Sequence, residues 1–121
     1  MIEFTYTFDQ LRSGLPEEDD MTFFDFHFTK THGGVKLHNY FTSDHGTVSA
    51  PTPEQACEKL YWIYNYAHPA SYSGRSMSVS DIVHLWDNRS DEPVKTSWFC
   101  DSFGFVQLDE NGHEIKKEDA R

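Results

Sequence analysis

The chain has 121 residues, 37% hydrophobic and 16% aromatic, a size and composition that fit one domain around one core. Ten basic against twenty acidic residues give a net charge of −10, which argues against direct binding of nucleic acid, because phosphate recognition needs a basic surface. The first residues lack the basic start and apolar stretch of a secretory leader, and no run approaches the roughly 18 apolar residues of a membrane span, so the sequence predicts a cytoplasmic protein with no membrane partner.

Alternating apolar and polar residues predict strands in the first half of the chain. Residues 2–8 alternate strictly, residues 21–29 place Phe at every second position from 24 to 28, and residues 35–41 continue the pattern. Turns are expected at 31–34 and 43–46. The segment 1–50 is therefore predicted to be an antiparallel meander.

One helix start is well marked. Thr52 can cap, Pro53 suits the first helical position and Gln55 completes a capping box. Apolar residues then recur at helical spacing, at Ala56, Leu60, Ile63 and Ala67. Since a residue before proline avoids helical angles, the helix should end by His68, ahead of Pro69. This predicts a principal helix over about 53–67, within the segment 52–68.

A β-hairpin is predicted over 76–108, because two apolar runs flank the polar, turn-prone segment 87–96. The end of the chain, 113–121, is a charged tail. These elements predict a single domain over 1–121 of the α+β class. Its mainly antiparallel sheet should have five to six strands, with the helix packed on one face.

The hairpin carries two sequence motifs. They read Gly74-Arg75-Ser76-Met77-Ser78-Val79-Ser80-Asp81-Ile82-Val83 and Cys100-Asp101-Ser102-Phe103-Gly104-Phe105. With their surroundings, over about residues 60–108, they resemble the YodL-like domain, a small bacterial domain often found in proteins of conjugative elements and phages. The resemblance implies a mobile-element or phage setting, where proteins often act against host defence. It carries over no settled activity, and we interpret the motif residues as structural.

The two aspartates of these motifs are the first candidates for chemistry. If the hairpin turn centres near Asp91, Asp81 lies roughly opposite Asp101, and opposed residues share a face of a sheet. Two close carboxylates would share a proton or bind a cation, as in a small hydrolase or metal-dependent enzyme. The simpler interpretation is that each aspartate caps local backbone donors.

Nucleophiles are less convincing. Ser76, Ser78 and Ser80 alternate, but Ser80 and His84 would lie about 13 Å apart along a strand, too far for a dyad. Cys57 and Cys100 have no metal-type spacing and are expected to be reduced thiols, and Cys100, in an apolar run, is expected to be buried and inert.

Seven histidines raise the question of a metal site. His27 and His38 could project from one polar face of the meander, but no pair has a short ligand spacing such as His-x-x-x-His. The sequence therefore predicts no metal and no cofactor.

Two hypotheses of function remain. The first is a non-enzymatic binding protein of a phage or mobile element that contacts a basic, nucleic-acid-binding host protein, as an inhibitor of the anti-CRISPR or anti-restriction type. Its acidic contact residues would be Glu17, Glu18, Asp19 and Asp20, and the abundant Tyr and Trp are a rival contact surface. The second is an enzyme that uses Asp81 and Asp101. We favour the first, because no convincing set of nucleophile, base and orienting group is present.

Overall fold

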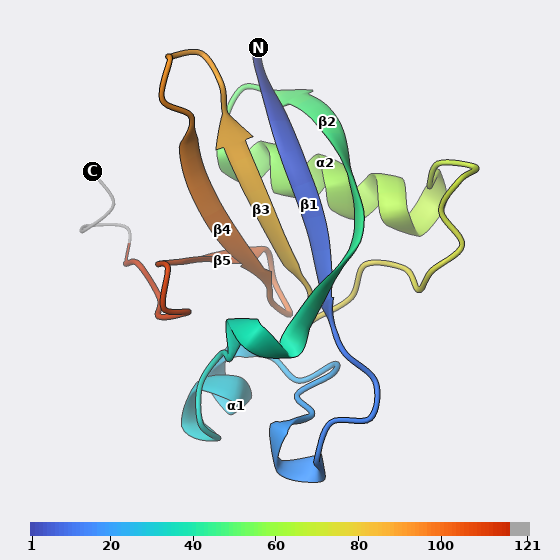
Figure 1. The fold of residues 1–121 in the computed structure, drawn as a ribbon, viewed down its shortest axis with the longest axis vertical. Coiled ribbons are helices and arrows are strands. Elements are labelled where there is room, and N and C mark those ends of the chain that lie inside the picture. Colours follow the sequence, from blue (N-terminus) through green and yellow to red (C-terminus); the bar gives the residue numbers. More distant parts are fainter. Residues whose placement is uncertain (117–121) are drawn as a thin grey trace.

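A computed structural model of the protein describes residues 1–116 (Figure 1). The strands are β1 (Ile2–Leu11), β2 (Tyr40–Ala50), β3 (Ile82–Asp87), β4 (Val94–Cys100) and β5 (Phe105–Leu108). The α-helices are α1 (Phe26–Thr31) and α2 (Pro53–Tyr66), and single 3-10 turns lie at Glu17–Asp19 and Leu37–Asn39. The helix predicted over about 53–67 is α2, with Thr52 Oγ1 accepting a hydrogen bond from the backbone N–H of Gln55 at 3.1 Å.

The sheet has the strand order β2-β1-β3-β4-β5, and every neighbouring pair is antiparallel. In Figure 1, α2 crosses behind the sheet, and α1 lies below it at the end where β1 leads into its following loop. The predicted α+β class, with a five-stranded antiparallel sheet and one principal helix on a face, is confirmed.

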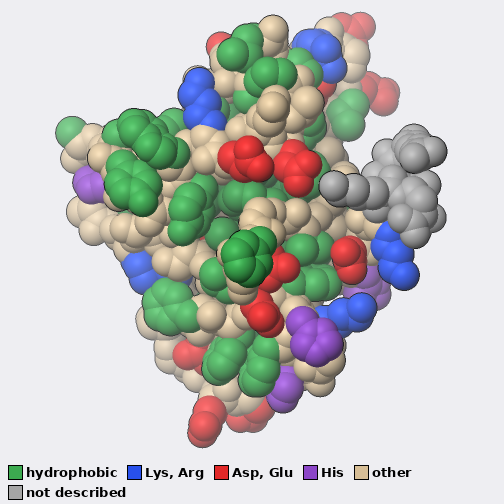
Figure 2. Space-filling view, turned by 180° about the vertical axis from the view of Figure 1, so that it is seen from behind, with side chains coloured by type: hydrophobic (Ala, Val, Ile, Leu, Met, Phe, Trp, Pro, Cys, Tyr) green, Lys and Arg blue, Asp and Glu red, His purple; other side chains and the backbone are tan. Residues whose placement is uncertain are grey.

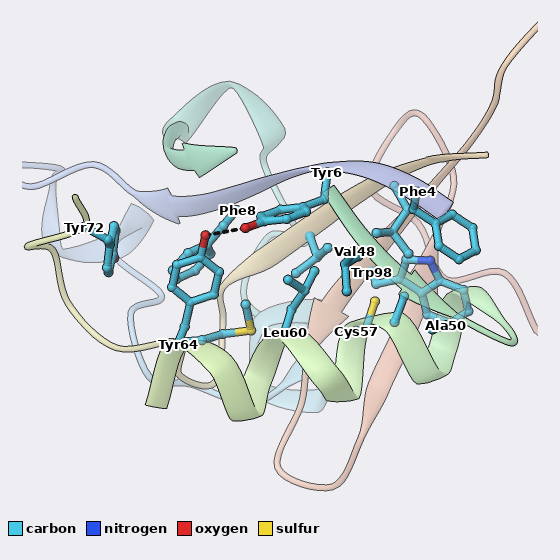
Figure 3. Close-up of a cluster of buried hydrophobic side chains, with 14 residues drawn as sticks. Phe4, Tyr6, Phe8, Val48, Ala50, Cys57, Leu60, Tyr64, Tyr72 and Trp98 are labelled. Carbon is cyan, nitrogen blue, oxygen red and sulfur yellow. Dashed lines mark hydrogen bonds between the residues drawn. The ribbon is translucent and has the colours of Figure 1, made fainter. Parts of the chain in front are cut away.

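The main core lies between α2 and the sheet (Figure 3). Because side chains alternate along a strand, the even-numbered residues of β1 face the helix, and Phe4 and Phe8 are almost completely buried there. Leu60 and Tyr64 of α2 meet them with no exposed surface.

A polar chain runs through this core and is fully hydrogen-bonded. The hydroxyls of Tyr6 and Tyr64 lie 2.7 Å apart, and Tyr64 donates to Asp44 Oδ2 at 2.6 Å (Figure 3). Burial raises the pKa of the Tyr64 hydroxyl, and its bond to Asp44 raises that pKa further. The hydroxyl therefore stays protonated and acts as a donor to the carboxylate of β2.

A second, smaller cluster covers one end of the opposite sheet face. It consists of Phe26, Val35, Ile82, Phe99 and Leu108. Ile82 and Phe99 are cross-strand partners whose neighbours in sequence face α2, so α1 and the segment after it pack on the face that α2 leaves free. The rings of Phe26 and Phe99 meet edge to face, with centroids 5.3 Å apart.

The predicted meander is wrong in its middle. Residues 21–25 form a loop, and residues 26–29 belong to α1. The helix begins there because the Asp25 carboxylate accepts a hydrogen bond from Phe28 N–H at 2.9 Å and caps its first turn. The segment 35–41 contains a 3-10 turn, and the turn expected at 43–46 is part of β2, where a register shift opposite Phe8 and Asp9 absorbs one residue.

The second half of the chain departs less from the prediction. The predicted hairpin is β3 and β4, with β5 added beside β4, and β3 begins only at Ile82. The segment 76–81, expected as strand, is a loop without helix or strand. After β5 the chain turns back, and Ile115 N–H donates to Gln107 C=O at 2.8 Å. Of the expected charged tail, residues 117–121 lie outside the described residues.

Candidate functional site

Asp81 is the buried centre of the first motif. Its side chain has no exposed surface and accepts three kinds of hydrogen bond: from Ser78 N–H at 2.8 Å, from Gln10 Nε2 at 3.2 Å and from Arg75 Nη2 at 3.0 Å. Burial raises the pKa of Asp81 against the opposing effects of Ser78 and Arg75. A carboxylate enclosed in this way closes the loop 75–81 and presents no free oxygen to a substrate.

Asp101 does not join Asp81 in a carboxylate pair. The register of β3 and β4 places Asp81 beside Cys100, whose N–H donates to Asp81 C=O at 2.8 Å, one residue away from the predicted pairing with Asp101. A shift of one residue sends a side chain to the other face of a sheet. Asp101 accordingly bonds elsewhere: its Oδ1 accepts from Phe26 N–H at 3.0 Å and from Ser102 N–H at 2.9 Å. The hydrolase hypothesis requires Asp81 and Asp101 side by side, and the structure does not place them so.

The serines and glycines of the two motifs determine the backbone conformation of the loops in which they lie. Ser80 has a positive φ of 85°, which few non-glycine residues adopt, and its N–H donates to Cys100 C=O at 2.9 Å. Ser76 and Ser78 lie in the same loop and not on a strand face. Gly104 has a φ of +73° and accepts from Asp101 N–H at 3.0 Å, and a Cβ on Gly74 would lie 2.6 Å from the Tyr72 hydroxyl. These residues support the structural interpretation of the motifs.

Three motif side chains converge on one segment, residues 23–26. The Arg75 guanidinium lies over the Phe23 ring, 4.9 Å from its centroid. Ser80 Oγ accepts from Phe23 N–H at 3.0 Å, and Asp101 accepts from the N–H of Phe26 as above. The motifs thus build the support for the loop that leads into α1.

The supported segment displays aromatic side chains to solvent. Phe23 is 60% exposed and Phe24 44% exposed. Phe23 and Ser80 are the two non-glycine residues with positive φ among residues 1–116, and they are hydrogen-bonded to each other. Strained backbone persists only where the surroundings hold it, and it concentrates at functional sites. The structure therefore directs attention to Phe23 and Phe24 as contact residues.

The acidic residues 17–20 lie beside this segment. Glu17, Glu18 and Asp20 are exposed, whereas Asp19 forms an ion pair with Lys36 at 2.8 Å. Asp20 accepts hydrogen bonds from the backbone N–H and the hydroxyl of Thr22. Three of the four predicted contact carboxylates are therefore on the surface, and the fourth is engaged within the protein.

A groove of about 830 Å³ joins the acidic residues to the aromatic ones. Its lining residues are Leu15, Glu17, Glu18, Asp20, Met21, Phe24, Phe28 and His32. In Figure 2, hydrophobic side chains lie next to acidic side chains and histidine at the lower end of the molecule, the end that carries α1 in Figure 1. The volume is in the range of ligand-binding clefts. We take this groove as the candidate site, together with Phe23, the exposed residue that precedes Phe24.

Three residues of the sheet, His84, Ser97 and Asp9, form a hydrogen-bonded set that the sequence did not predict. His84 Nδ1 lies 2.7 Å from Ser97 Oγ, and His84 Nε2 lies 3.3 Å from Asp9 Oδ2. The three residues come from β3, β4 and β1, so only the register brings them together, and the predicted first strand ended at Phe8, one residue before Asp9. Ser97 is only 6% exposed, which leaves its hydroxyl without an open position for a substrate carbonyl.

The contact between Asp9 and His84 should nevertheless make the free energy of unfolding depend on pH. Burial alone raises the pKa of Asp9, but the hydrogen bond and charge of His84, with weaker bonds from Thr42 and Thr7, outweigh it and hold that pKa below its usual range. Asp9 therefore contributes stability above the unfolded-state pKa of about 3.9, and this contribution is lost as pH falls through the lower folded-state value.

The substitution Asp9→Asn tests this directly. We expect the variant to unfold at lower urea concentration than wild type near neutral pH, with the difference in unfolding free energy shrinking below about pH 4. Asp91→Asn, in the exposed loop between β3 and β4, is the control for loss of one carboxylate. A difference that stays constant down to about pH 3 would show that the charge of Asp9 contributes nothing.

The thiols and histidines do not form a reactive centre. Cys57 and Cys100 are free and buried, and burial raises the pKa of Cys100 to about 12. His27 lies in α1 and His38 in the second 3-10 turn, so they do not share the strand face on which they were expected. Within residues 1–116, no three His, Cys, Asp or Glu side chains are grouped as metal ligands.

Fold and site together define a small α+β domain whose motif residues brace a surface loop. A family model for the YodL-like domain matches residues 5–110, so the chain belongs to the YodL-like domain family. No curated protein and no solved structure shows significant similarity to the chain. None of the helices in the described part of the chain combines the length and hydrophobicity that crossing a membrane requires.

Proposed function

We propose that this protein is a non-enzymatic binding protein of a phage or mobile element that acts in the host cytoplasm by protein–protein contact. Its partner is a basic, nucleic-acid-binding host protein, and its effect is inhibition of a nuclease-based defence of the CRISPR or restriction type. The observation that carries the proposal is the convergence of Arg75, Ser80 and Asp101 on the segment 23–26.

The convergence favours binding over catalysis. The motif carboxylates are occupied by hydrogen bonds within the fold, and the segment 23–26 that they brace carries the exposed apolar side chains of Phe23 and Phe24. Exposed aromatic residues on a fixed backbone make good anchors for an interface, because they bury a large area and lose little conformational freedom.

The charge of the protein favours a basic partner. With a net charge of −10, the protein repels nucleic acid and attracts surfaces built to hold phosphates. Glu17, Glu18 and Asp20 line the groove beside Phe24, so attraction and apolar contact are available at one place. Electrostatic attraction of this kind speeds association and makes it sensitive to salt.

A phage-challenge assay tests the proposal. Cells that carry a CRISPR nuclease or a restriction system should lose resistance when they express the wild-type protein. The double variant Phe23→Ser/Phe24→Ser should restore resistance, because it removes the anchors. Phe103→Ser is the matched control, since Phe103 is 95% exposed in the β4–β5 connection and is not among the residues that line the groove.

The pattern of outcomes distinguishes the possible surfaces. Full resistance with wild-type protein in both kinds of cell would contradict the defence-inhibitor role. Lost resistance that survives the Phe23/Phe24 change would contradict the site and transfer attention to the exposed aromatic residues of α2, namely Tyr61, Trp62 and Tyr66. Figure 2 shows hydrophobic side chains gathered on the side that carries α2.

A further inference from the structure

The floor of the groove is a stack of three flat rings. Phe24 and Phe28 lie with centroids 4.1 Å apart and planes inclined by 16°, and Phe28 and His32 lie 3.8 Å apart at 11°. Phe28 lies in α1, Phe24 precedes the N-cap of this helix and His32 is its C-cap, so the stack runs along one side of the short helix and beyond its start. His32 is fixed in the stack by a hydrogen bond from its Nδ1 to Phe28 C=O at 2.8 Å.

The wall of the groove is acidic, and no lysine or arginine is among the residues that line it. Glu17, Glu18 and Asp20 line it together with the apolar Leu15 and Met21. Lys36, which pairs with Asp19, is not among the lining residues. Phe28 is covered on both faces by Phe24 and His32, so the face of Phe24 that Phe28 does not cover is the one left for a flat cation beside the negative charge.

Guanidinium fits these two features better than ammonium does. It is planar, stays charged, is weakly hydrated, stacks on aromatic rings and donates to a carboxylate through two N–H groups at once. A lysine ammonium is a strongly hydrated point charge and gains less from stacking.

The protein already binds a guanidinium in this manner at Phe23, the residue that precedes Phe24. Arg75 lies over the ring of Phe23 at 4.9 Å and donates to the Asp81 carboxylate at 3.0 Å. Ring and carboxylate act together there on one arginine, and the exposed neighbour Phe24 with Glu17 and Glu18 offers the same two partners to an arginine from outside.

We propose that the groove binds an arginine side chain of a basic segment of the partner protein, with the guanidinium against Phe24 and its N–H groups directed to the carboxylates of Glu17 and Glu18. The inference rests on the proposed function, because it names the chemistry by which the same surface recognises its partner. The arginine, not the total positive charge of the segment, determines affinity.

Labelled peptides test the inference with purified protein. The probe is a fluorescein peptide with three arginines spaced by Gly and Ser, compared with a lysine peptide of equal charge and a neutral citrulline peptide. Fluorescence anisotropy at low and moderate salt should show the arginine peptide binding more tightly than the lysine peptide, and the citrulline peptide not binding.

Two variants locate the binding. Phe24→Ala should weaken the arginine peptide by about two- to fivefold, the range for a cation–π contact at a partly exposed site. Glu17→Gln/Glu18→Gln should weaken it further and flatten the salt dependence. The controls are Phe103→Ala, another exposed aromatic, and Asp91→Asn/Glu92→Gln, which removes the same charge from the loop at the opposite end of the sheet (Figure 1).

Some results would overturn the inference. Equal binding of arginine and lysine peptides, or equal weakening by the two double charge variants, would mean that the protein attracts cations by net charge alone. Because Phe28 stacks on Phe24, circular dichroism must show that Phe24→Ala keeps its helices, and the Glu17/Glu18 variant decides the matter if it does not.

The inference and the proposed function can fail separately. If the arginine peptide binds in the groove but the protein never lowers resistance to phage, the proposed function fails and the groove chemistry stands. If resistance falls and depends on Phe23 and Phe24 while the peptides show no preference for arginine, the function stands and the arginine inference fails.

Discussion

Leu60→Ala should lower the free energy of unfolding by about 2–5 kcal/mol, the range for truncating a fully buried leucine. Leu60 has no exposed surface and lies at the middle of α2, in the cluster that also contains Phe8, Tyr64 and Leu85 (Figure 3). The substitution removes three carbon atoms from the packed interface between α2 and the sheet. The resulting cavity stays open, because the strands beneath are too rigid to move in and fill it.

Urea unfolding followed by circular dichroism measures the effect. Trp62→Ala is the matched control, because it removes a larger side chain from the same helix at a position that is 57% exposed. The control should change stability by about 0.5 kcal/mol or less. If the two variants lost equal stability, α2 would not be packed on the sheet through Leu60.

The sequence was most informative where a local signal and a tertiary contact agree. The capping box at Thr52 and the apolar spacing of Ala56 and Leu60 predict α2, and both side chains are fully buried under it. The alternation in β1 predicts which residues face the core for the same reason: one side of the element is covered and the other is not.

The segment 21–29 shows why alternation can mislead. Phe24, Phe26 and Phe28 fit a strand, but Phe28 lies in α1 and stacks on Phe24, which precedes the helix, while Phe26 packs into the core. Both periods fit three residues, and the cap at Asp25 decided between them. The candidate groove depends on this helix, so sequence alone could indicate its acidic wall but not its aromatic floor.

The motif residues could be recognised from sequence, but their arrangement could not. A register one residue away from the expected one separates Asp81 from Asp101. The positive φ of Ser80 is set by its contacts with Phe23 and Cys100, which are distant in sequence. No propensity of serine predicts such a conformation, because tertiary contacts impose it.

Asp81→Ala should cost about 2–3 kcal/mol of stability and also release the segment that carries Phe23. The carboxylate has no exposed surface, so its loss leaves the N–H of Ser78 without its acceptor and removes the partner of Arg75. Breaking a fully buried ion pair costs about 3–5 kcal/mol. The expected cost is lower here, because Arg75 is partly exposed at 34% and can turn to water.

Asp101→Ala is the companion variant, and about 1 kcal/mol is expected, because Asp101 is half-buried and acts on the first turn of α1 as a cap. Thermal and urea unfolding give the stabilities, and the arginine-peptide titration gives the state of the groove. Both variants should lose peptide affinity while still folded. Arg75 and Asp101 position the segment 23–26, and this segment carries Phe24, the ring proposed to contact the peptide's arginine. An Asp81→Ala protein that melts like wild type and binds the peptide unchanged would contradict the view that the motifs exist to brace this surface.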